Sequence, residues 1–329
     1  MEKSKFKKAI IFDCDNTLWK GIVGEEEIKH YTDLQKDIIF FANHGVIIGL
    51  CSKNNEADVI EAMKDQLLTD KYISIKRINW NDKASNLKEI AEELNIGLDA
   101  IVFVDDKEFE RELVKKQLPE VMTITPQELT RVVLDNFDLK GNFTKTQQYK
   151  ENYQRAKAKE QFTDINEYLA SLDMVLKIEV NESKHIPRIV ELTQKTNQFN
   201  LTSHRCNEDN IKRFMASGYV YTLSVKDKFG DNGLTGVCAI YHGVIDIFLL
   251  SCRILGRGIE YAFIDKIMKD YKKRKSDTLV LGIYVPTSKN GQVADFYPKL
   301  GFNFTDDKSI FTINSNDYKP HAAKYFRYE

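Results

Sequence analysis

The stretch Lys8-Ala-Ile-Ile-Phe-Asp-Cys-Asp-Asn-Thr17 determines the fold that we predict for the first half of the chain. It is a short apolar run that ends in the carboxylates of Asp13 and Asp15. Two further apolar runs, Val46-Ile-Ile-Gly-Leu-Cys-Ser52 and Ala100-Ile-Val-Phe-Val-Asp-Asp106, also end in polar residues, and segments with helical spacing separate the three. Continuous apolar strands that alternate with helices are typical of a parallel sheet covered on both faces. We therefore predict an α/β domain whose chemistry gathers at the carboxyl ends of its strands.

The second half of the chain shows a different order of elements. Strand patterns at 219–225, 234–241 and 244–251 precede a helical pattern at 258–271, and a further strand pattern covers 278–284. Strands in succession followed by a helix indicate an α+β domain, distinct from the first. We predict an N-terminal domain at 1–140, a helical connector at 141–170 and a C-terminal domain at 171–329.

The composition excludes several classes of protein. Among 329 residues, 48 Lys and Arg balance 49 Asp and Glu, and the net charge of −1 argues against a basic nucleic-acid-binding protein. No apolar run approaches the ~20 residues that cross a bilayer, so we expect no membrane partner. The five cysteines include no C-x-x-C pair, which is typical of free thiols in a reducing compartment. We therefore expect a cytoplasmic protein.

The polar residues after the first-half strands suit phosphate chemistry. Asp13 and Asp15 lie two residues apart on a loop, so both carboxylates can point into one pocket. One can attack phosphorus as a nucleophile, and the other can carry the proton of the leaving oxygen. Two close anions repel, so we expect a divalent cation between them. Four further residues can bind phosphoryl oxygens or the cation, namely Ser52, Lys83, Asp105 and Asp106.

Four segments of this half resemble the motifs of the haloacid dehalogenase (HAD) superfamily of phosphohydrolases. They are Ile11-Phe-Asp-Cys-Asp-Asn-Thr-Leu-Trp19, Leu50-Cys-Ser52, Lys83 and Val102-Phe-Val-Asp-Asp106. The resemblance implies a Rossmann-like parallel sheet in which Asp13 accepts the phosphoryl group and Asp15 is the acid/base. It also implies that Ser52 and Lys83 hold the phosphoryl group.

The same resemblance implies Mg²⁺ as the cofactor. The implied ligands are Asp13, Asp15, Asp105 and Asp106. Only about 30 residues separate successive motifs, which leaves little room for an inserted cap domain. We therefore predict a capless site, in which a large substrate, a protein-tethered substrate or the second domain must exclude water.

In the second half, Arg253-Ile-Leu-Gly-Arg-Gly258 resembles the pyrophosphate loop of the GNAT acyltransferases, in which glycines let the backbone close on a phosphate at a helix N-terminus. The segment 294–302 resembles a later GNAT segment, and Tyr297 would be its tyrosine acid. We therefore predict a GNAT-like α+β domain in which Arg253, Gly256 and Gly258 bind substrate.

Cys252 directly precedes this loop. A helix N-terminus and neighbouring arginines favour a thiolate, and a thiolate can accept an acyl group and pass it to another thiol. The alternative interpretation is a buried cysteine at the end of a strand. The other four cysteines are interpreted as packing residues.

The two halves together resemble the FkbH-like family over nearly the whole chain. The resemblance rests on Trp19-Lys-Gly-Ile-Val-Gly-Glu25, Gln194-Lys-Thr-Asn-Gln-Phe-Asn-Leu201, Phe229-Gly-Asp-Asn-Gly233, Ser251-Cys-Arg-Ile-Leu-Gly-Arg-Gly258 and Tyr284-Val-Pro-Thr-Ser-Lys-Asn290. It implies an enzyme that takes 1,3-bisphosphoglycerate, removes phosphate and loads the glyceryl group as a thioester on an acyl carrier protein. Cys252 maps to the residue that carries the acyl group in transit.

Three asparagines and one histidine are further candidates in the second half. We expect Asn197, Asn200 and Asn290 to orient the acyl carbonyl or the phosphopantetheine arm of the carrier. The alternative is that they are surface or turn residues. His204 could be a base for Cys252, although an isolated histidine in a loop is more often solvated.

Two other functions stay open. One is a Mg²⁺-dependent HAD phosphatase whose GNAT-like domain only docks a carrier protein or acyl-CoA. The other is an acetyl-CoA acyltransferase with a vestigial first half, although the complete set of Asp13, Asp15, Ser52, Lys83 and Asp105 argues against a vestige.

Overall fold

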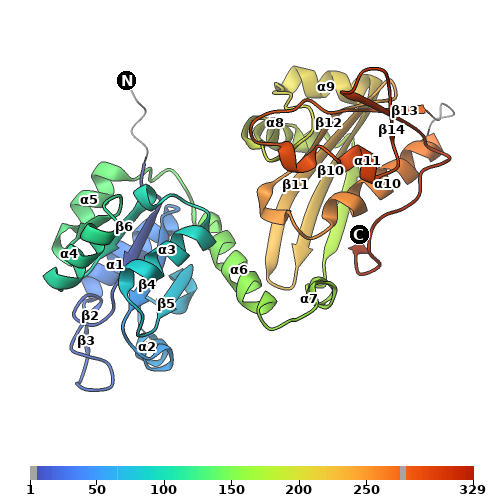
Figure 1. The fold of residues 1–329 in the computed structure, drawn as a ribbon. Coiled ribbons are helices and arrows are strands. Elements are labelled where there is room, and N and C mark those ends of the chain that lie inside the picture. Colours follow the sequence, from blue (N-terminus) through green and yellow to red (C-terminus); the bar gives the residue numbers. More distant parts are fainter. Residues whose placement is uncertain (1–5, 65, 275–278) are drawn as a thin grey trace. The chain divides into compact units, whose positions relative to one another are not determined.

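The computed structural model describes residues 6–64, 66–274 and 279–329. The chain forms two compact units, Met1–Glu160 and Gln161–Glu329 (Figure 1). The predicted connector at 141–170 contains two helices. Helix α6 (Phe143–Lys159) belongs to the first unit, and helix α7 (Ile165–Ser171) belongs to the second.

The first unit is built on a five-stranded sheet with the order β5-β4-β1-β6-β7, in which every pairing is parallel. The central strand β1 (Ala9–Phe12) is fully buried and lies between β4 (Ile47–Ser52) and β6 (Ile101–Val104). The edges are β5 (Ile75–Ile78) and β7 (Met122–Ile124). From β1 the chain continues through β4 and β5 on one side of β1, and it then crosses to β6 and β7 on the other side. The strand order therefore reverses at β1, and a ligand crevice is expected at the carboxyl end of that strand.

Helices cover both faces of this sheet because side chains on β1 alternate between two cores. Ile10 and Phe12 pack in one core, with helices α1 (Thr32–Asn43), α2 (Glu56–Met63) and α5 (Leu129–Asn136). Ala9 and Ile11 pack in the other, with α3 (Lys83–Leu94), α4 (Glu108–Gln117) and α6. The predicted α/β architecture is confirmed. Between β1 and α1 the chain forms only the small hairpin β2 (Trp19–Lys20) and β3 (Lys29–His30), so no cap domain is inserted there.

The second unit contains a mostly antiparallel sheet with the order β14-β15-β13-β12-β11-β10-β8-β16. Its long central strands are β10 (Gly218–Asp227), β11 (Gly230–Tyr241) and β12 (Val244–Leu250), flanked by β8 (Val175–Val180) and β13 (Leu279–Ile283). The short strands are β14 (Asn303–Phe304), β15 (Ile310–Asn314) and β16 (Arg327–Tyr328). The predicted α+β arrangement is confirmed, while Thr278, the first residue of the last predicted strand, lies outside the described residues.

Helices pack on both faces of the second sheet. The core against α8 (Ile186–Lys195) and α9 (Glu208–Ser217) includes Ile247 and Leu249 of β12. On the other face, the ring of Phe248 lies 5.6 Å from that of Phe263 in α10 (Ile259–Arg274), the helix predicted at 258–271. The short helix α11 is Phe296–Lys299. Among the described residues, no helix combines the length and the apolar character needed to cross a bilayer.

Strand β12 pairs with β13 only through its first two residues, at Val244–Leu281 and Ile245–Gly282. Further along, the edge of β12 pairs with the two-residue strand β9 (Phe199–Asn200). Leu201 then joins the two sides, because its N–H donates to Phe248 at 3.1 Å and its carbonyl accepts from Val285 at 2.8 Å. A segment of the chain itself therefore fills the gap between the diverging strands.

Candidate functional sites

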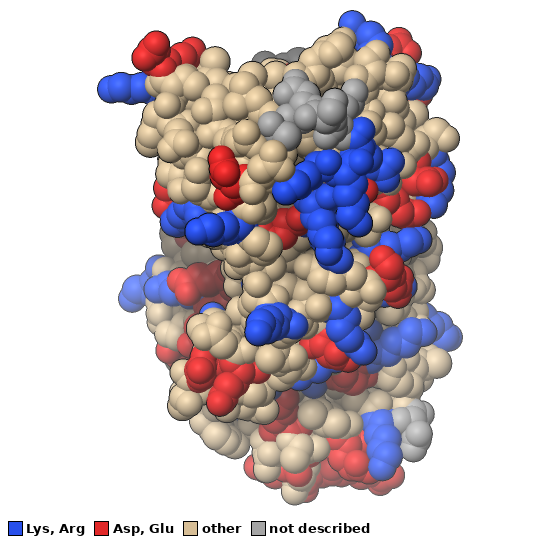
Figure 2. All heavy atoms as spheres, turned by 90° about the vertical axis from the view of Figure 1, so that its right-hand side faces the viewer, with Lys and Arg blue, Asp and Glu red and all other residues tan. Residues whose placement is uncertain are grey.

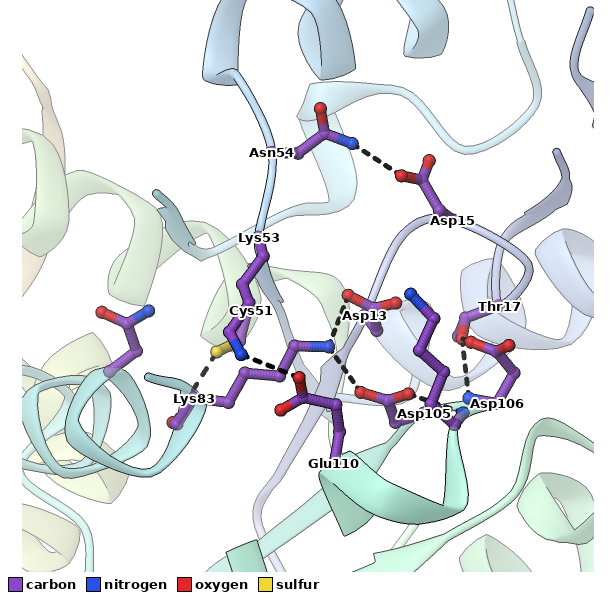
Figure 3. A network of polar contacts seen from close by, with 12 residues as sticks. Asp13, Asp15, Thr17, Cys51, Lys53, Asn54, Lys83, Asp105, Asp106 and Glu110 are labelled. Atoms are coloured by element: carbon purple, nitrogen blue, oxygen red, sulfur yellow. Dashed lines mark hydrogen bonds and ion pairs between the residues drawn. The ribbon is translucent and has the colours of Figure 1, made fainter. Parts of the chain in front are cut away.

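Three charged residues meet at the carboxyl edge of the first sheet (Figure 3). Asp13 follows β1, Asp105 follows β6 and Lys83 begins α3, and all three are almost completely buried. The Lys83 Nζ lies 2.9 Å from Asp13 Oδ1 and 2.5 Å from Asp105 Oδ2. Burial and the charge of Asp13 raise the pKa of Asp105, while the two carboxylates hold the pKa of Lys83 above its usual value against the effect of burial. Lys83 therefore stays charged between the two acids.

The carboxylates of Asp13, Asp105 and Asp106 form a group that fits a hard cation. One oxygen of each lies within 4.8 Å of the other two. Oxygen donors of this kind are the ligands that Mg²⁺ prefers. Thr17 fixes Asp106, since its hydroxyl lies 3.2 Å from Asp106 Oδ1 and accepts from the Asp106 N–H at 3.1 Å. Arg111 braces the same loop by donating to the carbonyl oxygens of Asp105 and Asp106, both at 2.8 Å.

The carboxylate of Asp15 is held outside this group, where it is bonded to Asn54 (Figure 3). Its Oδ1 accepts from Trp19 Nε1 at 3.0 Å and from the Val23 N–H at 3.1 Å, and its Oδ2 accepts from Asn54 Nδ2 at 2.8 Å. Burial raises the pKa of Asp15, and this effect exceeds that of the hydrogen bonds from Val23 and Trp19, which favour the ionised carboxylate and lower the pKa. A raised pKa increases the protonated fraction, which suits a proton donor to a leaving oxygen. The structure thus separates Asp15 from the three grouped carboxylates, although the sequence grouped all four as metal ligands.

Strand pairing places Ser52 at the same edge of the sheet as Asp13. Ser52 ends β4, which pairs with β1 in parallel, and its side chain is buried. The next residue, Lys53, reaches to Glu110 on α4, where its Nζ lies 2.8 Å from Oε1. The sequence carries little signal for Asn54, Lys53 and Arg111. Lys53 and Asn54 directly follow the end of β4, and Arg111 lies in the helix that follows β6.

Replacing Asn54 with Ala is expected to slow Mg²⁺-dependent hydrolysis of p-nitrophenyl phosphate by roughly 10- to 100-fold, because Asp15 loses the donor that orients its Oδ2. The rate constant kcat measures the effect. The matched control is Asn81→Ala, an exposed residue on the loop after the neighbouring strand β5, which should hydrolyse at the wild-type rate. Equal rates for the two variants would show that Asn54 does not position the acid.

The five cysteines differ sharply in their surroundings. Cys252 is exposed, whereas Cys14, Cys51, Cys206 and Cys238 are buried. Burial raises the pKa of all four buried thiols, and it brings that of Cys51 to about 12. The alternative interpretation of Cys252 as a buried residue at a strand end is therefore wrong. Of the five cysteines, Cys252 is the one exposed to a reaction partner in solution.

The loop that follows Cys252 has the backbone shape that its glycines allow. Gly256 and Gly258 have φ angles of 75° and 70°, a region in which other residues are strained, and helix α10 begins directly afterwards. The guanidinium of Arg257 lies 3.0 Å from Asp227 Oδ2 and donates to the Arg253 carbonyl at 2.7 Å. Arg257 is almost buried in these contacts, so its charge fixes the loop to the β10–β11 hairpin. Arg253 donates from Nε to Ser251 Oγ at 3.3 Å.

Two of the three predicted asparagines meet at the gap between β12 and β13. The side chain of Asn290 donates to the carbonyl oxygens of Asn200 and Val285, both at 2.9 Å. The side chain of Asn200 binds main-chain atoms of Thr196 and Ser203. Both asparagines are buried and hold loops together. Their predicted contact with the acyl group or the pantetheine arm stays a prediction, as does that of Asn197, whose Oδ1 accepts from Arg205.

Neither predicted proton-transfer residue of the second half lies in an open position near Cys252. Tyr297 is 1% exposed and packs so closely on Gly282 that a Cβ there would lie 2.4 Å from the ring, and burial raises the pKa of Tyr297. His204 binds Asp246 Oδ2 at 3.2 Å. Because β9 runs antiparallel to β12, the chain leads His204 away from the end of β12 that carries Cys252.

A carboxyl group that the sequence analysis did not single out lies next to the glycine loop. Glu260, two residues after Gly258, has a buried Oε2 with no hydrogen-bond partner among the described residues, and burial raises its pKa. The Tyr325 hydroxyl donates to the Arg257 carbonyl at 3.4 Å and thereby closes the loop from the other side. The only sequence signal for Glu260 was its place in the first helical turn after the loop.

No family model matches the chain, and no curated protein matches it. Among solved structures, the N-terminal part of protein BF1531 from Bacteroides fragilis, described as containing a phosphatase domain complexed with Mg, is 35% identical. The match covers 41% of this chain and 41% of that chain, with a TM-score of 0.38. This chain thus spans well under half of that relative.

Two more solved structures are similar at lower identity. The 3-deoxy-D-manno-octulosonate 8-phosphate phosphatase from Moraxella catarrhalis is 20% identical over 33% of this chain and 63% of that chain, with a TM-score of 0.28. The ribosomal-protein-S18-alanine N-acetyltransferase from Escherichia coli is 11% identical over 45% of this chain and 97% of that chain, with a TM-score of 0.32. Because each TM-score lies below 0.5, we argue function from the residues of this chain itself.

Proposed function

We propose that the chain is a bifunctional enzyme that removes phosphate in its first unit and transfers an acyl group through Cys252 in its second. The observation that carries the phosphatase half is the group of carboxylates of Asp13, Asp105 and Asp106, in which Asp13 and Asp105 also contact Lys83. The acyl-transfer half is supported by the exposure of Cys252 beside the glycine loop.

In the phosphatase reaction, a carboxylate oxygen of Asp13 attacks phosphorus, and the bond from phosphorus to the ester oxygen breaks. Asp15 gives its proton to that oxygen. Asp15 then takes a proton from a water molecule, the oxygen of that water bonds to phosphorus, and the bond between phosphorus and Asp13 breaks to release phosphate. Lys83 and Ser52 bind the phosphoryl oxygens. Mg²⁺, held by Asp13, Asp105 and Asp106, would neutralise negative charge on the phosphoryl group.

For the second reaction we propose 1,3-bisphosphoglycerate as the substrate. The Cys252 thiolate attacks the acyl-phosphate carbonyl, a C–S bond forms, and the C–O bond to phosphate breaks. The thiol of a phosphopantetheine arm then attacks the thioester, so that the glyceryl group moves to an acyl carrier protein and the Cys252 thiolate is restored. The two ends of the substrate thus need the two different chemistries that the two units offer.

Intact-mass spectrometry tests this proposal. The protein incubated with 1,3-bisphosphoglycerate and Mg²⁺ is expected to gain the mass of one glyceryl group and to release inorganic phosphate. Phosphate release without any adduct would favour the alternative in which the second unit only docks a carrier. An adduct formed from acetyl-CoA instead would favour the acetyltransferase alternative.

A further inference from the structure

A groove of about 560 Å³ lies on the second unit between helix α10 and the C-terminal segment 315–328. Apolar side chains line it from both sides, among them Met268 of the helix and Phe326 of the segment. Ser315 also lines it; this residue is 4% exposed, and its buried Oγ has no hydrogen-bond partner among the described residues. The groove therefore presents an apolar surface, and a buried polar atom without a partner lies in its wall.

The rim of the groove is positively charged. Lys266, Lys269 and Lys272 recur every three residues and so share one face of α10, and Lys324 lies on the opposite wall. Lys266 stacks on the ring of Tyr328, with Nζ 3.7 Å from the ring centre. No carboxylate of a described residue forms an ion pair with these lysines. Figure 2 shows Lys and Arg side chains gathered on the side of the molecule that carries α10.

Asp265, the one acidic residue that lines the groove, already accepts hydrogen bonds from within the protein. Asp265 accepts hydrogen bonds from the Tyr318 hydroxyl at 2.6 Å and from the N–H groups of His321 and Ala322 at 2.9 and 2.8 Å. These bonds fasten the C-terminal segment to α10. The carboxylate of Asp265 is thus directed into the wall, and the free charge of the groove is positive.

We propose that this groove docks an acidic carrier protein, the partner that receives the acyl group from Cys252. The inference rests on the proposed acyl transfer. An amphipathic helix with acidic and apolar side chains matches a groove with a cationic rim and an apolar floor. A polynucleotide is a poorer match, because the cationic rim is confined to four lysines and the chain as a whole has a net charge of −1.

The position of the groove along α10 suits a carrier with a long prosthetic arm. Lys269 lies eleven residues after Gly258, and a helical rise of about 1.5 Å per residue places it roughly 16 Å along the helix from the glycine loop. The flexible phosphopantetheine arm separates the docking surface of a carrier from its reactive thiol. The carrier can therefore dock by charge at the groove while its thiol reaches Cys252.

Binding of a holo-acyl carrier protein with an acidic recognition helix, measured by isothermal titration calorimetry, tests the proposal. Lys269→Glu/Lys272→Glu is expected to weaken binding by at least about tenfold at low ionic strength, and salt should weaken wild-type binding. The matched control is Lys115→Glu/Lys116→Glu on α4, which changes the net charge equally with exposed lysines of the first unit. We expect the control to bind as the wild type does.

Equal affinities of the two variants would overturn the proposal, as would a wild-type chain that does not bind the carrier. The same holds if vesicles of phosphatidylcholine and phosphatidylglycerol bind at the groove lysines while the carrier does not. Formation of the Cys252 adduct without any carrier is measured in parallel for all proteins. If the wild-type protein forms no adduct, the proposed function is refuted. The calorimetry measures carrier binding and therefore tests the role of the groove alone.

Discussion

Asp13→Asn is expected to lower Mg²⁺-dependent phosphate release by roughly 10⁴-fold or more, because the amide cannot form the bond to phosphorus on which the reaction depends. The substitution also removes one of the two carboxylates that flank Lys83 and one member of the three-carboxylate group. The rate of phosphate release from p-nitrophenyl phosphate, and separately from 3-phosphoglycerate esters, measures the effect.

The same variant has a second, qualitative result. Cys252 is intact, so the chain should still take up the acyl group from 1,3-bisphosphoglycerate, but the adduct should keep its phosphate ester. The mass of the Asp13→Asn adduct should then exceed that of the wild type by one phosphoryl group. Asp135→Asn, an exposed residue of α5, is the matched control and should behave as the wild type in both assays. Normal phosphate release by Asp13→Asn would contradict the proposed mechanism.

Cys252→Ser is expected to abolish the acyl adduct and all transfer to a carrier, since a serine hydroxyl is not ionised near neutral pH and is a far weaker nucleophile than a thiolate. Hydrolysis of p-nitrophenyl phosphate should continue, because its residues lie in the other unit. Intact-mass spectra and a phosphate assay on the same sample separate the two activities.

Alkylation of the folded wild-type protein provides a check that needs no variant. Iodoacetamide should label one of the five cysteines, because the other four thiols are buried and have raised pKa values. The labelled protein should then form no acyl adduct. An adduct that persists after labelling, or in Cys252→Ser, would remove the acyl-carrier role from this residue.

Much of the first unit could be predicted from the sequence because its signals are local. The apolar runs of β1, β4 and β6 each end in a residue of the site, and parallel pairing brings those ends to one edge. The edge strands β5 and β7 were not predicted, because two of the four residues of β5 are charged and β7 has only three residues. The contacts of Asn54 and Arg111 depend on side-chain directions across separate loops, which no local pattern specifies.

The second unit was harder to predict because its key contacts are distant in sequence. Cys252 and Cys238 both lie in or next to apolar strands, yet one is exposed and the other is buried. The contact of Asn290 with the Asn200 carbonyl joins residues 90 positions apart. The strand β9 has only two residues and forms because the divergence of β12 and β13 leaves backbone groups that need partners.

The filled gap beside β12 also affects how the protein can interact with other polypeptide chains. A strand with an unpaired edge is a template on which another extended chain can add, either as a ligand or as the start of aggregation. Here β9 and Leu201 already use the hydrogen-bonding groups of β12 beyond its pairing with β13. An extended peptide or amide-containing arm that is to pair with this edge of β12 must first displace the chain's own segment, so self-association and unspecific strand addition are both suppressed at this position.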